Sequence, residues 1–341
     1  MKKMMKNKIL VIGKEGRLAR YTADKKKLDD YDISYVPVGT TAGQLLDAGK
    51  DASYVIVDAI GNVPGDVIRQ MPELKLIHSE GVGYQGVDID AADERGIYVC
   101  NCKGMNAAAV AEQAVLLMLG LLRDVAGGDR SVRAGEQIAV KEAYMMAGDL
   151  RELGECRVGL IGLGDIGKAT AGLLSAFGAE VIYHKPHRLA EADEKLHGVR
   201  YMELDELLAC SDIVSLHLPV NGSTRYMADS AFFAKMKDSA YLINTSRGEL
   251  VNSQDLVKAL ENGEIAGAGL DTIDGEPVAA DNDLLTISEE AGRKLLLSCH
   301  IGGITGASFR RGYDMIWSDI EKVRAGEKPD NIVNHPETAG A

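Results

Sequence analysis

Residues 157–188 read RVGLIGLGDIGKATAGLLSAFGAEVIYHKPHR, and this stretch decides the fold. A short apolar run leads into Gly162-Leu163-Gly164-Asp165-Ile166-Gly167, which fits the pattern G-x-G-x-x-G, and a helix-like run follows it. The three glycines suit a tight turn at 162, close approach of the backbone to a pyrophosphate at 164, and helix packing at 167. Free N–H groups at the start of the helix would hold the pyrophosphate. The order of strand, glycine loop and helix therefore predicts a dinucleotide-binding unit.

The same stretch ends on a basic loop. In units that bind NAD, an acidic residue about 20 positions beyond the glycines accepts hydrogen bonds from the ribose. That position holds His184, and Lys185, His187 and Arg188 follow it. A carboxylate would repel the 2′-phosphate of NADP, whereas these side chains would attract it. Arg188 is expected to be the stronger contact, because its guanidinium can donate two hydrogen bonds. We therefore expect NADP(H), with NAD(H) as the alternative; the competing interpretation is a solvated basic loop.

Size and charge exclude several classes of function. The chain has 341 residues, enough for two domains, and 46% of them are hydrophobic. A net charge of −13 argues against general binding to nucleic acid or to an anionic membrane surface. No apolar run approaches the roughly 20 residues of a membrane helix. Five scattered cysteines without metal-ligand spacing suit a reducing compartment, so we expect a cytoplasmic protein without a metal site: Cys100, Cys102, Cys156, Cys210 and Cys299.

Short apolar runs alternate with helical patterns along most of the chain. One series of predicted strands ends near residue 101, and a second begins at residue 157 and ends near His300. Such alternation is typical of parallel sheets with helices on both faces. Long helices are predicted from Asn106 and after His300. The expected fold class is α/β, with two doubly wound parallel-sheet domains of the Rossmann type.

Three segments that follow strands of the second series carry candidate catalytic residues. Arg247 lies in LINTSRGELVN, Asp271 and Glu276 in GLDTIDGEP, and His300 in SCHIGG. In open parallel sheets, ligands bind outside the carboxyl ends of the strands. We therefore expect all three segments to converge on the edge that also carries the glycine loop. Each residue has a structural alternative: a surface ion pair, a hydrogen-bonded core histidine or a turn residue.

With these segments in view, the chain resembles the D-isomer-specific 2-hydroxyacid dehydrogenase family. The resemblance covers most of the chain and includes SEGVGYQGVDIDAADERGIYVCN, GMNAAAVAEQAVLLML, GLIGLGDIGKA, DIVSLHLP, LINTSRGELVN, GLDTIDGEP, HIGG and EKPDNIVN. It implies a substrate-binding domain of residues 1–103 and 301–341, into which a dinucleotide-binding domain of residues 104–300 is inserted. It also implies a homodimer built around the helix between the domains and the segment that follows it.

The resemblance assigns roles to residues of this sequence. It implies that Arg247 binds substrate and that Glu276 and His300 form an acid–base pair. The segments around Val82 and Gly83 would hold the substrate carboxylate through backbone N–H groups, and Asn106 would lie at the cleft. The expected cofactor-binding residues are Gly162, Gly164, Asp165, Ile166, Gly167, His184, Lys185, Arg188, His217, Pro219, Thr245, Asp271 (at the nicotinamide end) and Gly302.

The chemistry of a 2-oxo acid reductase fits these residue types. The reaction needs a hydride from the nicotinamide and a proton for the developing alkoxide, and histidine as a residue type titrates near neutrality. A neighbouring carboxylate would stabilise the imidazolium, and an arginine can bind carboxylate and carbonyl oxygens together. The sequence thus predicts an oxidoreductase that transfers hydride between NAD(P)H and a small 2-oxo acid or D-2-hydroxy acid.

Departures from the family pattern keep alternatives open. His184 replaces the usual aspartate, and Gln113 stands where many members have histidine. Residues 58–62 carry no arginine, so a phosphorylated substrate is not expected. A formate-type enzyme would pair its histidine with glutamine, which Glu276 argues against. A phosphite-type dehydrogenase on the same fold and a non-catalytic NAD(H)-sensing protein of the corepressor type remain the alternatives, and the intact set of candidate residues favours an enzyme.

Overall fold

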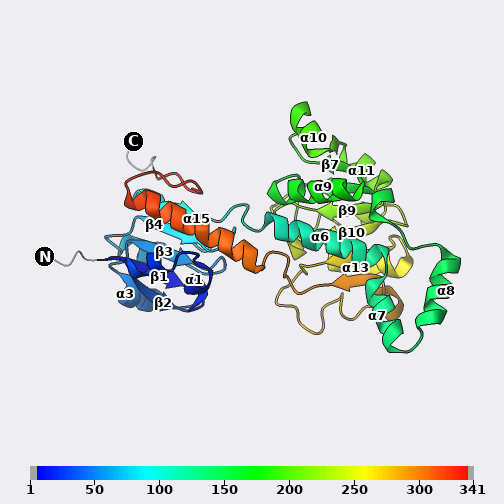
Figure 1. Ribbon diagram of the computed structural model, residues 1–341, viewed down its shortest axis with the longest axis horizontal. Helices are drawn as coiled ribbons and strands as arrows, with labels where there is room; N and C mark the ends of the chain where they lie inside the picture. The colour runs from blue at the N-terminus through cyan, green and yellow to red at the C-terminus, as the bar shows by residue number, and fades with distance from the viewer. Residues whose placement is uncertain (1–5, 337–341) are drawn as a thin grey trace. The chain divides into compact units, whose positions relative to one another are not determined.

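The computed structural model describes residues 6–336, and the chain divides into two compact units. One unit contains residues 1–106 and 304–341, and residues 107–303 form the other, so the second unit is an insertion into the first. Residues 1–5 and 337–341 of the predicted substrate-binding domain lie outside the described part of the chain. Both units contain a parallel sheet with helices on both faces, so the predicted fold class is confirmed (Figure 1).

The first unit is built on a five-stranded sheet with the order β2-β1-β3-β4-β5. Side chains alternate along each strand: Leu10 and Ile12 pack with α3, α4 and α5, whereas Ile9 and Val11 pack with α1 and α15. This period of two is what a strand buried on both faces requires. The elements are β1 (Asn7–Ile12), α1 (Arg17–Tyr21), α2 (Lys26–Asp29), β2 (Tyr31–Val36), α3 (Ala42–Gly49), β3 (Tyr54–Val57), α4 (Gly65–Arg69), β4 (Leu76–Ser79), α5 (Ile89–Glu94), β5 (Tyr98–Cys100) and α15 (Gly306–Arg324).

The second unit is built on a seven-stranded sheet with the order β12-β11-β10-β9-β6-β7-β8. Helices α6 and α9 cover one face, and α11, α12 and α13 cover the other (Figure 1). The strand order reverses between β6 and β9, which is where such sheets bind dinucleotides. The elements are α6 (Ala107–Leu122), α7 (Val125–Arg133), α8 (Gln137–Ala147), β6 (Arg157–Ile161), α9 (Asp165–Phe177), β7 (Glu180–His184), α10 (Glu191–His197), β8 (Arg200–Tyr201), α11 (Leu204–Cys210), β9 (Ile213–Leu216), α12 (Ser230–Phe233), β10 (Tyr241–Asn244), α13 (Ser253–Asn262), β11 (Gly267–Leu270), α14 (Glu289–Gly292) and β12 (Leu295–Leu297).

Two features of the second unit were not predicted from the sequence. The short edge strand β8 has only two residues, too few for a periodic signal. The helix predicted to begin at Asn106 ends at Leu122, because Asp124 adopts a left-handed conformation (φ 41°) and caps α7 by accepting a hydrogen bond from Gly127 N–H at 3.0 Å. Helices α7 and α8 then form a hairpin. No helix among residues 6–336 is long and apolar enough to cross a membrane.

Candidate active site

The glycine loop lies at the point where the strand order of the second sheet reverses. Gly162 has a φ of 95°, and a Cβ atom there would lie 2.2 Å from the carbonyl oxygen of His217, which follows β9. A Cβ atom on Gly167 would lie 2.6 Å from the carbonyl oxygen of Gly162. Gly164, by contrast, has no neighbouring atom within 4 Å of a built Cβ. Two glycines are therefore needed for packing, and the third leaves space for a ligand at the start of α9.

Buried polar atoms without partners line the same sheet edge. Among the described residues these atoms are Nδ1 of His217 and the hydroxyl oxygens of Thr245 and Thr272, which follow β9, β10 and β11. Burial lowers the pKa of His217 to about 4, so its ring is neutral at pH 7, and Nε2 lies 2.9 Å from Ser215 Oγ. Leaving a buried polar group unpaired costs about 1–3 kcal/mol, which a ligand can offset. This edge and the glycine loop fit a nicotinamide dinucleotide; Thr272 was not predicted.

His300 and Glu276 form a close pair. Nδ1 of His300 lies 2.6 Å from Oε2 of Glu276, and the other carboxylate oxygen accepts a hydrogen bond from Ile273 N–H at 2.8 Å. Both carboxylate oxygens are therefore held, and the Nδ1 contact fixes the ring. Nε2 of His300 has no partner within residues 6–336, and about half of the side chain is exposed. The free ring nitrogen is thus available to exchange a proton with a bound molecule.

The loop that carries Arg247 packs on the loop that carries Glu276. A Cβ atom on Gly248 would lie 2.1 Å from the carbonyl carbon of Ile273, so the two loops touch through their backbones. The exposed guanidinium of Arg247 donates to the carbonyl oxygen of Ser246 at 2.8 Å. Strands β10, β11 and β12 are neighbours in the sheet, which brings the three predicted catalytic segments to one edge.

Asp271 is buried and holds the chain around His300. Its carboxylate accepts hydrogen bonds from the Ser298 hydroxyl at 2.6 Å, from Ile301 N–H at 3.0 Å and from Gly302 N–H at 2.8 Å. His300 itself adopts a left-handed conformation with a φ of 54°. The aspartate therefore stabilises a backbone conformation that residues other than glycine rarely adopt.

The basic loop after β7 is partly occupied by contacts of its own. Nε and Nη2 of Arg188 donate to the two carboxylate oxygens of Glu194 at 2.8 and 2.9 Å, which lowers the pKa of Glu194 to about 2. Nδ1 of His184 lies 3.1 Å from the carbonyl oxygen of Met202, so Nε2 is its remaining nitrogen. Lys185 has no polar partner among the described residues. Lys185 and His184 are thus freer to meet a ligand than Arg188.

In the first unit, the loop that follows β4 presents free N–H groups. The carbonyl oxygens of Gly81, Val82 and Gly83 accept hydrogen bonds from Cys102 N–H, the Asn101 amide and the Ser79 hydroxyl. The N–H groups of Val82 and Gly83 have no acceptor within residues 6–336. Successive N–H groups of this kind can bind an anion.

A charged network lies at the same edge of the first sheet, where β1, β3 and β4 end. Nη1 of Arg17 donates to Asp58 Oδ2 at 2.6 Å and to Glu80 Oε2 at 2.7 Å. The hydroxyl of Tyr313 donates to the other oxygen of Glu80. Burial raises the pKa of Glu80, while Tyr313 and Arg17 oppose that rise. No sequence motif indicated that Arg17 would donate hydrogen bonds to Asp58 and Glu80, which lie 41 and 63 positions further along the chain.

The remaining predicted site residues lie as follows. Asn106 is half-buried and directly precedes α6 in the chain. Asp165 and Ile166 are the first two residues of α9. Pro219 is exposed beyond β9, and Gly302 is buried against Asp271.

Comparison with known proteins agrees with this geometry. Residues 115–302 match the family model described as D-isomer specific 2-hydroxyacid dehydrogenase, NAD binding domain. The chain belongs to the D-isomer specific 2-hydroxyacid dehydrogenase family. The predicted family is therefore confirmed. The chain is an oxidoreductase that uses a nicotinamide cofactor to transfer hydride between 2-oxo acids and 2-hydroxy acids.

Individual relatives and solved structures are similar to this chain over most of their length. The chain is 34% identical over 291 residues to a glyoxylate reductase of Thermofilum pendens, covering 85% of this chain and 84% of the relative. A D-isomer specific 2-hydroxyacid dehydrogenase from Lactobacillus delbrueckii ssp. bulgaricus, solved with NAD, has a TM-score of 0.77 at 30% identity, covering 96% of this chain and 100% of that one. An acyclic imino acid reductase solved with NADPH and D-Arg has a TM-score of 0.78 at 25% identity, covering 96% of this chain and 99% of that one.

Proposed function

We propose that this dehydrogenase reduces a small, unphosphorylated 2-oxo acid such as glyoxylate, hydroxypyruvate or a short alkyl analogue. The observation that supports this most is the His300–Glu276 pair, whose free Nε2 lies at the sheet edge that also carries the glycine loop and the unpaired polar atoms. The glyoxylate reductases among its relatives support the same substrate size.

In this proposal the chain's own residues bind, orient and protonate the substrate. The nicotinamide supplies the hydride when it is bound, and the glycine loop, His217 and Thr245 would hold the cofactor. His300 donates a proton from Nε2 to the carbonyl oxygen, and Glu276 at Nδ1 orients the ring and stabilises the imidazolium. Arg247 neutralises charge that develops on the substrate oxygens.

The substrate carboxylate is assigned to backbone donors. Val82 and Gly83 support this assignment, because their carbonyl oxygens already accept hydrogen bonds from Asn101 and Ser79, whereas their N–H groups have no acceptor among the described residues. Asn106 is assigned to substrate binding because its position matches the family pattern. Within the proposal, residues 1–103 with 301–341 serve the substrate and residues 104–300 serve the cofactor.

A phosphorylated substrate is disfavoured by the charges at the first sheet's edge. Arg17 is the cation of the network at this edge, and it is bonded to both Asp58 and Glu80. The network has one positive and two negative charges while Glu80 is ionised, so its own charge is negative. A phosphate dianion would have to displace these carboxylates from the arginine, whereas a small neutral side chain would not.

For the cofactor we propose NADPH as the preferred form. The support is local: position 184 carries no carboxylate, and Lys185 is free to meet a 2′-phosphate. The similar imino acid reductase solved with NADPH is consistent with this choice. Because Glu194 already binds two nitrogens of Arg188, we rank Lys185 and His184 above Arg188 as phosphate contacts.

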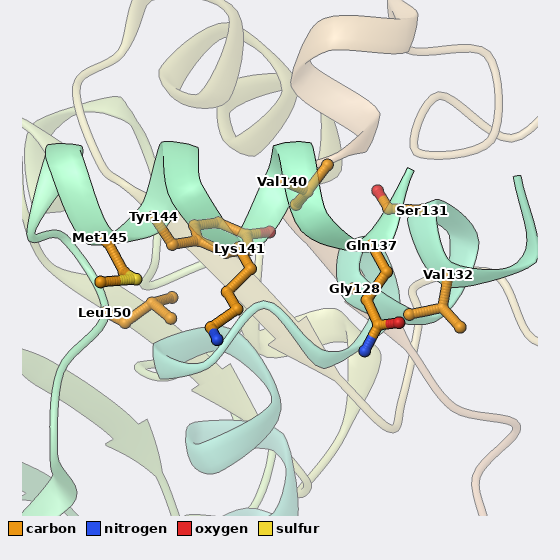
Figure 2. Close-up of a pocket in the computed structure, with 9 residues that line it drawn as sticks. All are labelled: Gly128, Ser131, Val132, Gln137, Val140, Lys141, Tyr144, Met145 and Leu150. Carbon is orange, nitrogen blue, oxygen red and sulfur yellow. The ribbon is translucent and has the colours of Figure 1, made fainter. Parts of the chain in front are cut away.

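A homodimer is proposed from the surface of the α7–α8 hairpin. Its groove of about 370 Å³ is lined by Gly128, Ser131, Val132, Gln137, Val140, Lys141, Tyr144, Met145 and Leu150 (Figure 2). Met145, which lines the groove, and its neighbour Met146 are 73% and 88% exposed. Exposed apolar side chains in this number commonly mark a protein interface, and a second copy of the chain is the partner we propose. Sedimentation equilibrium of the wild type and of Met145→Lys/Met146→Lys tests it.

The catalytic proposal is tested by steady-state reduction of a panel of 2-oxo acids with NADH and NADPH in parallel. Glyoxylate, hydroxypyruvate and 2-oxobutyrate should be turned over, and 3-phosphohydroxypyruvate should be a poor substrate. NADPH should give the higher kcat/KM. Absence of turnover with every 2-oxo acid, or a clear preference for the phosphorylated compound, would overturn the proposed substrate class.

A further inference from the structure

A chain of hydrogen bonds links helix α6 to the turn that carries His300. Gln113 on α6 donates from Nε2 to Ser298 Oγ at 2.9 Å, and the Ser298 hydroxyl donates to Oδ1 of Asp271 at 2.6 Å. Ser298 has a single hydroxyl hydrogen, and the ionised carboxylate can only accept. Ser298 must therefore accept from Gln113 and donate to Asp271, which fixes the direction of both bonds. All three side chains belong to the second unit.

The end of this chain supports the backbone on the carboxyl side of His300. Asp271 accepts hydrogen bonds from the N–H groups of Ile301 and Gly302, the two residues that follow His300. His300 itself has a φ of 54°, a conformation that side chains other than glycine disfavour. Without the Asp271 carboxylate, the two backbone N–H groups that follow His300 would lose their acceptor, and the contact of the His300 ring with Glu276 would be left to hold the turn. The direction of the imidazole thus depends on the position of Asp271.

Gln113 also touches the turn directly. A Cβ atom on Gly302 would lie 2.9 Å from Oδ2 of Asp271 and 3.3 Å from Cβ of Gln113. The space beside Gly302 is therefore bounded by Gln113, the same residue whose amide supports the turn through Ser298. The hydrogen bond and this close approach both relate α6 to the residues beside His300.

We propose that Gln113 and Ser298 are positioning residues for His300, acting through Asp271. Their function is to keep Nδ1 of His300 on Glu276 and to leave Nε2 directed toward the substrate. The inference rests on the proposed acid–base role of His300. It assigns to Asp271 a structural task within the chain itself, beside the cofactor contact that remains a prediction. Neither Gln113 nor Ser298 needs to touch substrate or cofactor.

Kinetics of Ser298→Ala and Gln113→Leu test the inference. Both variants should lower kcat ten- to hundredfold, since misplacing a catalytic group by about 1 Å can cost about 10²-fold. KM for the 2-oxo acid and the Kd for NADPH should change little, and the pH profile of kcat should change shape. Ser298→Thr keeps the hydroxyl and should restore most of the wild-type kcat. Ser211→Ala is the matched control, since it removes another serine hydroxyl bond (to Leu207 O, 2.6 Å) in the same unit.

A second readout does not depend on turnover. In the cofactor-free protein, the ring signals of His300, assigned by their loss in His300→Gln, should be single and sharp in the wild type. They should broaden or double in Ser298→Ala but stay unchanged in Ser211→Ala. Unchanged kcat and unchanged ring signals in both Ser298→Ala and Gln113→Leu would overturn the inference. So would a loss of kcat matched by an equal loss of cofactor binding. If the wild type reduced no 2-oxo acid while the ring signals still responded, the proposed function would fail and the positioning role would stand.

Discussion

The carboxyl edges of the two parallel sheets differ in whether their polar groups are paired. In the first unit, Arg17, Asp58 and Glu80 follow β1, β3 and β4, and the arginine donates hydrogen bonds to both carboxylates. In the second, His217 and Thr245 follow β9 and β10 and keep buried polar atoms without partners among the described residues. Both sheets are doubly wound, so the architecture alone does not distinguish the edges.

The difference teaches where to look for a binding site. Charges that satisfy one another stabilise a fold and need no ligand, whereas unpaired buried groups are costly until a ligand pairs with them. Function therefore depends on the residues grafted onto each edge, not on the fold that they share. The first edge carries free backbone N–H groups at Val82 and Gly83, and the second carries the His300–Glu276 pair to which we assign proton exchange in the proposed function.

The largest expected effect is a loss of turnover when the proposed proton donor at the second edge is removed. His300→Ala removes the proposed proton donor and should lower kcat by roughly 10²- to 10⁴-fold. Glu276→Gln should change the pH profile of kcat, because the imidazolium loses its charged neighbour. His197→Ala, a histidine on α10, is the control and should leave turnover unchanged. Near-normal turnover of His300→Ala would remove the proton-transfer role from this edge.

Alanine substitutions of Gly162 and Gly164 should distinguish the effect of the glycine loop on stability from its effect on cofactor binding. Gly162→Ala places a Cβ atom 2.2 Å from a carbonyl oxygen at a φ of 95°, so we expect a loss of about 3–5 kcal/mol in stability. Gly164→Ala meets no atom within 4 Å and should fold normally, yet its Kd for the cofactor should rise. Thermal unfolding and fluorescence titration with NADPH check the pair. Equal cofactor affinity in Gly164→Ala and wild type would contradict the placement of the pyrophosphate.

Acid titration probes the unpaired, neutral histidine. The pKa of His217 is about 4 in the folded chain because the ring is buried, against about 6.5 for an exposed histidine, so the unfolded state binds the extra proton between these values. Stability should therefore fall as the pH drops from 6.5 toward 4, by at most about 3 kcal/mol at about 1.4 kcal/mol per unit. His217→Gln should show a shallower fall across this window, measured by urea unfolding without cofactor. Parallel curves for the two proteins would mean that His217 is not buried in the neutral form.

The basic loop tests which cofactor the second edge selects. Lys185→Ala should lower kcat/KM with NADPH about ten- to hundredfold, because a charge-assisted hydrogen bond contributes about 1.5–3 kcal/mol. Arg188→Ala should have a smaller effect, since Glu194 binds its guanidinium, and His184→Asp should shift preference toward NADH. Lys195→Ala, on α10, is the control. A wild type that prefers NADH, or variants that slow both cofactors equally, would show the loop to be solvated surface.

The smallest expected effect follows from substituting Arg17 at the first edge, which should lower stability without changing cofactor binding. Arg17→Met leaves Asp58 and Glu80 without their shared cation and should cost about 1–2 kcal/mol, discounted for the partial exposure of the arginine. Its Kd for NADPH should equal that of the wild type. Arg20→Met is the control on the same helix. A changed NADPH affinity in Arg17→Met would break the contrast between the two edges.

The fold was predictable because its signals are local and repeated. The strand from Arg157 to Ile161, the glycine loop and α9 follow one another in the chain, so a single stretch contains the whole binding unit. Buried strands such as Tyr54–Val57 are continuous apolar runs bounded by turns. Strand β8 escaped prediction because two residues have no period, and the α7–α8 hairpin because Asp124 ends the helical pattern through its backbone conformation.

The site was predictable only where a residue follows a strand in a recognisable segment. Glu276 and His300 fall in that class, and the structure brings them to 2.6 Å. The contacts of Gln113 with Ser298, and of Arg17 with Glu80, join residues 185 and 63 positions apart. Such pairings depend on how helices dock on the sheet, which no local pattern encodes. The pairing of Arg188 with Glu194 joins residues only six positions apart, but the sequence pattern showed the charge of the arginine and not its contact.

The backbone contact between Gly248 and Ile273 has a consequence for protein engineering. Because the loop of Arg247 rests on the loop of Glu276 without intervening side chains, neither can be lengthened or swapped alone. A library that aims to change substrate scope should therefore exchange the two loops together, as one cassette taken from a single parent. Recombination breakpoints between residues 248 and 273 should yield few active chimeras, and breakpoints outside that interval should be tolerated far better.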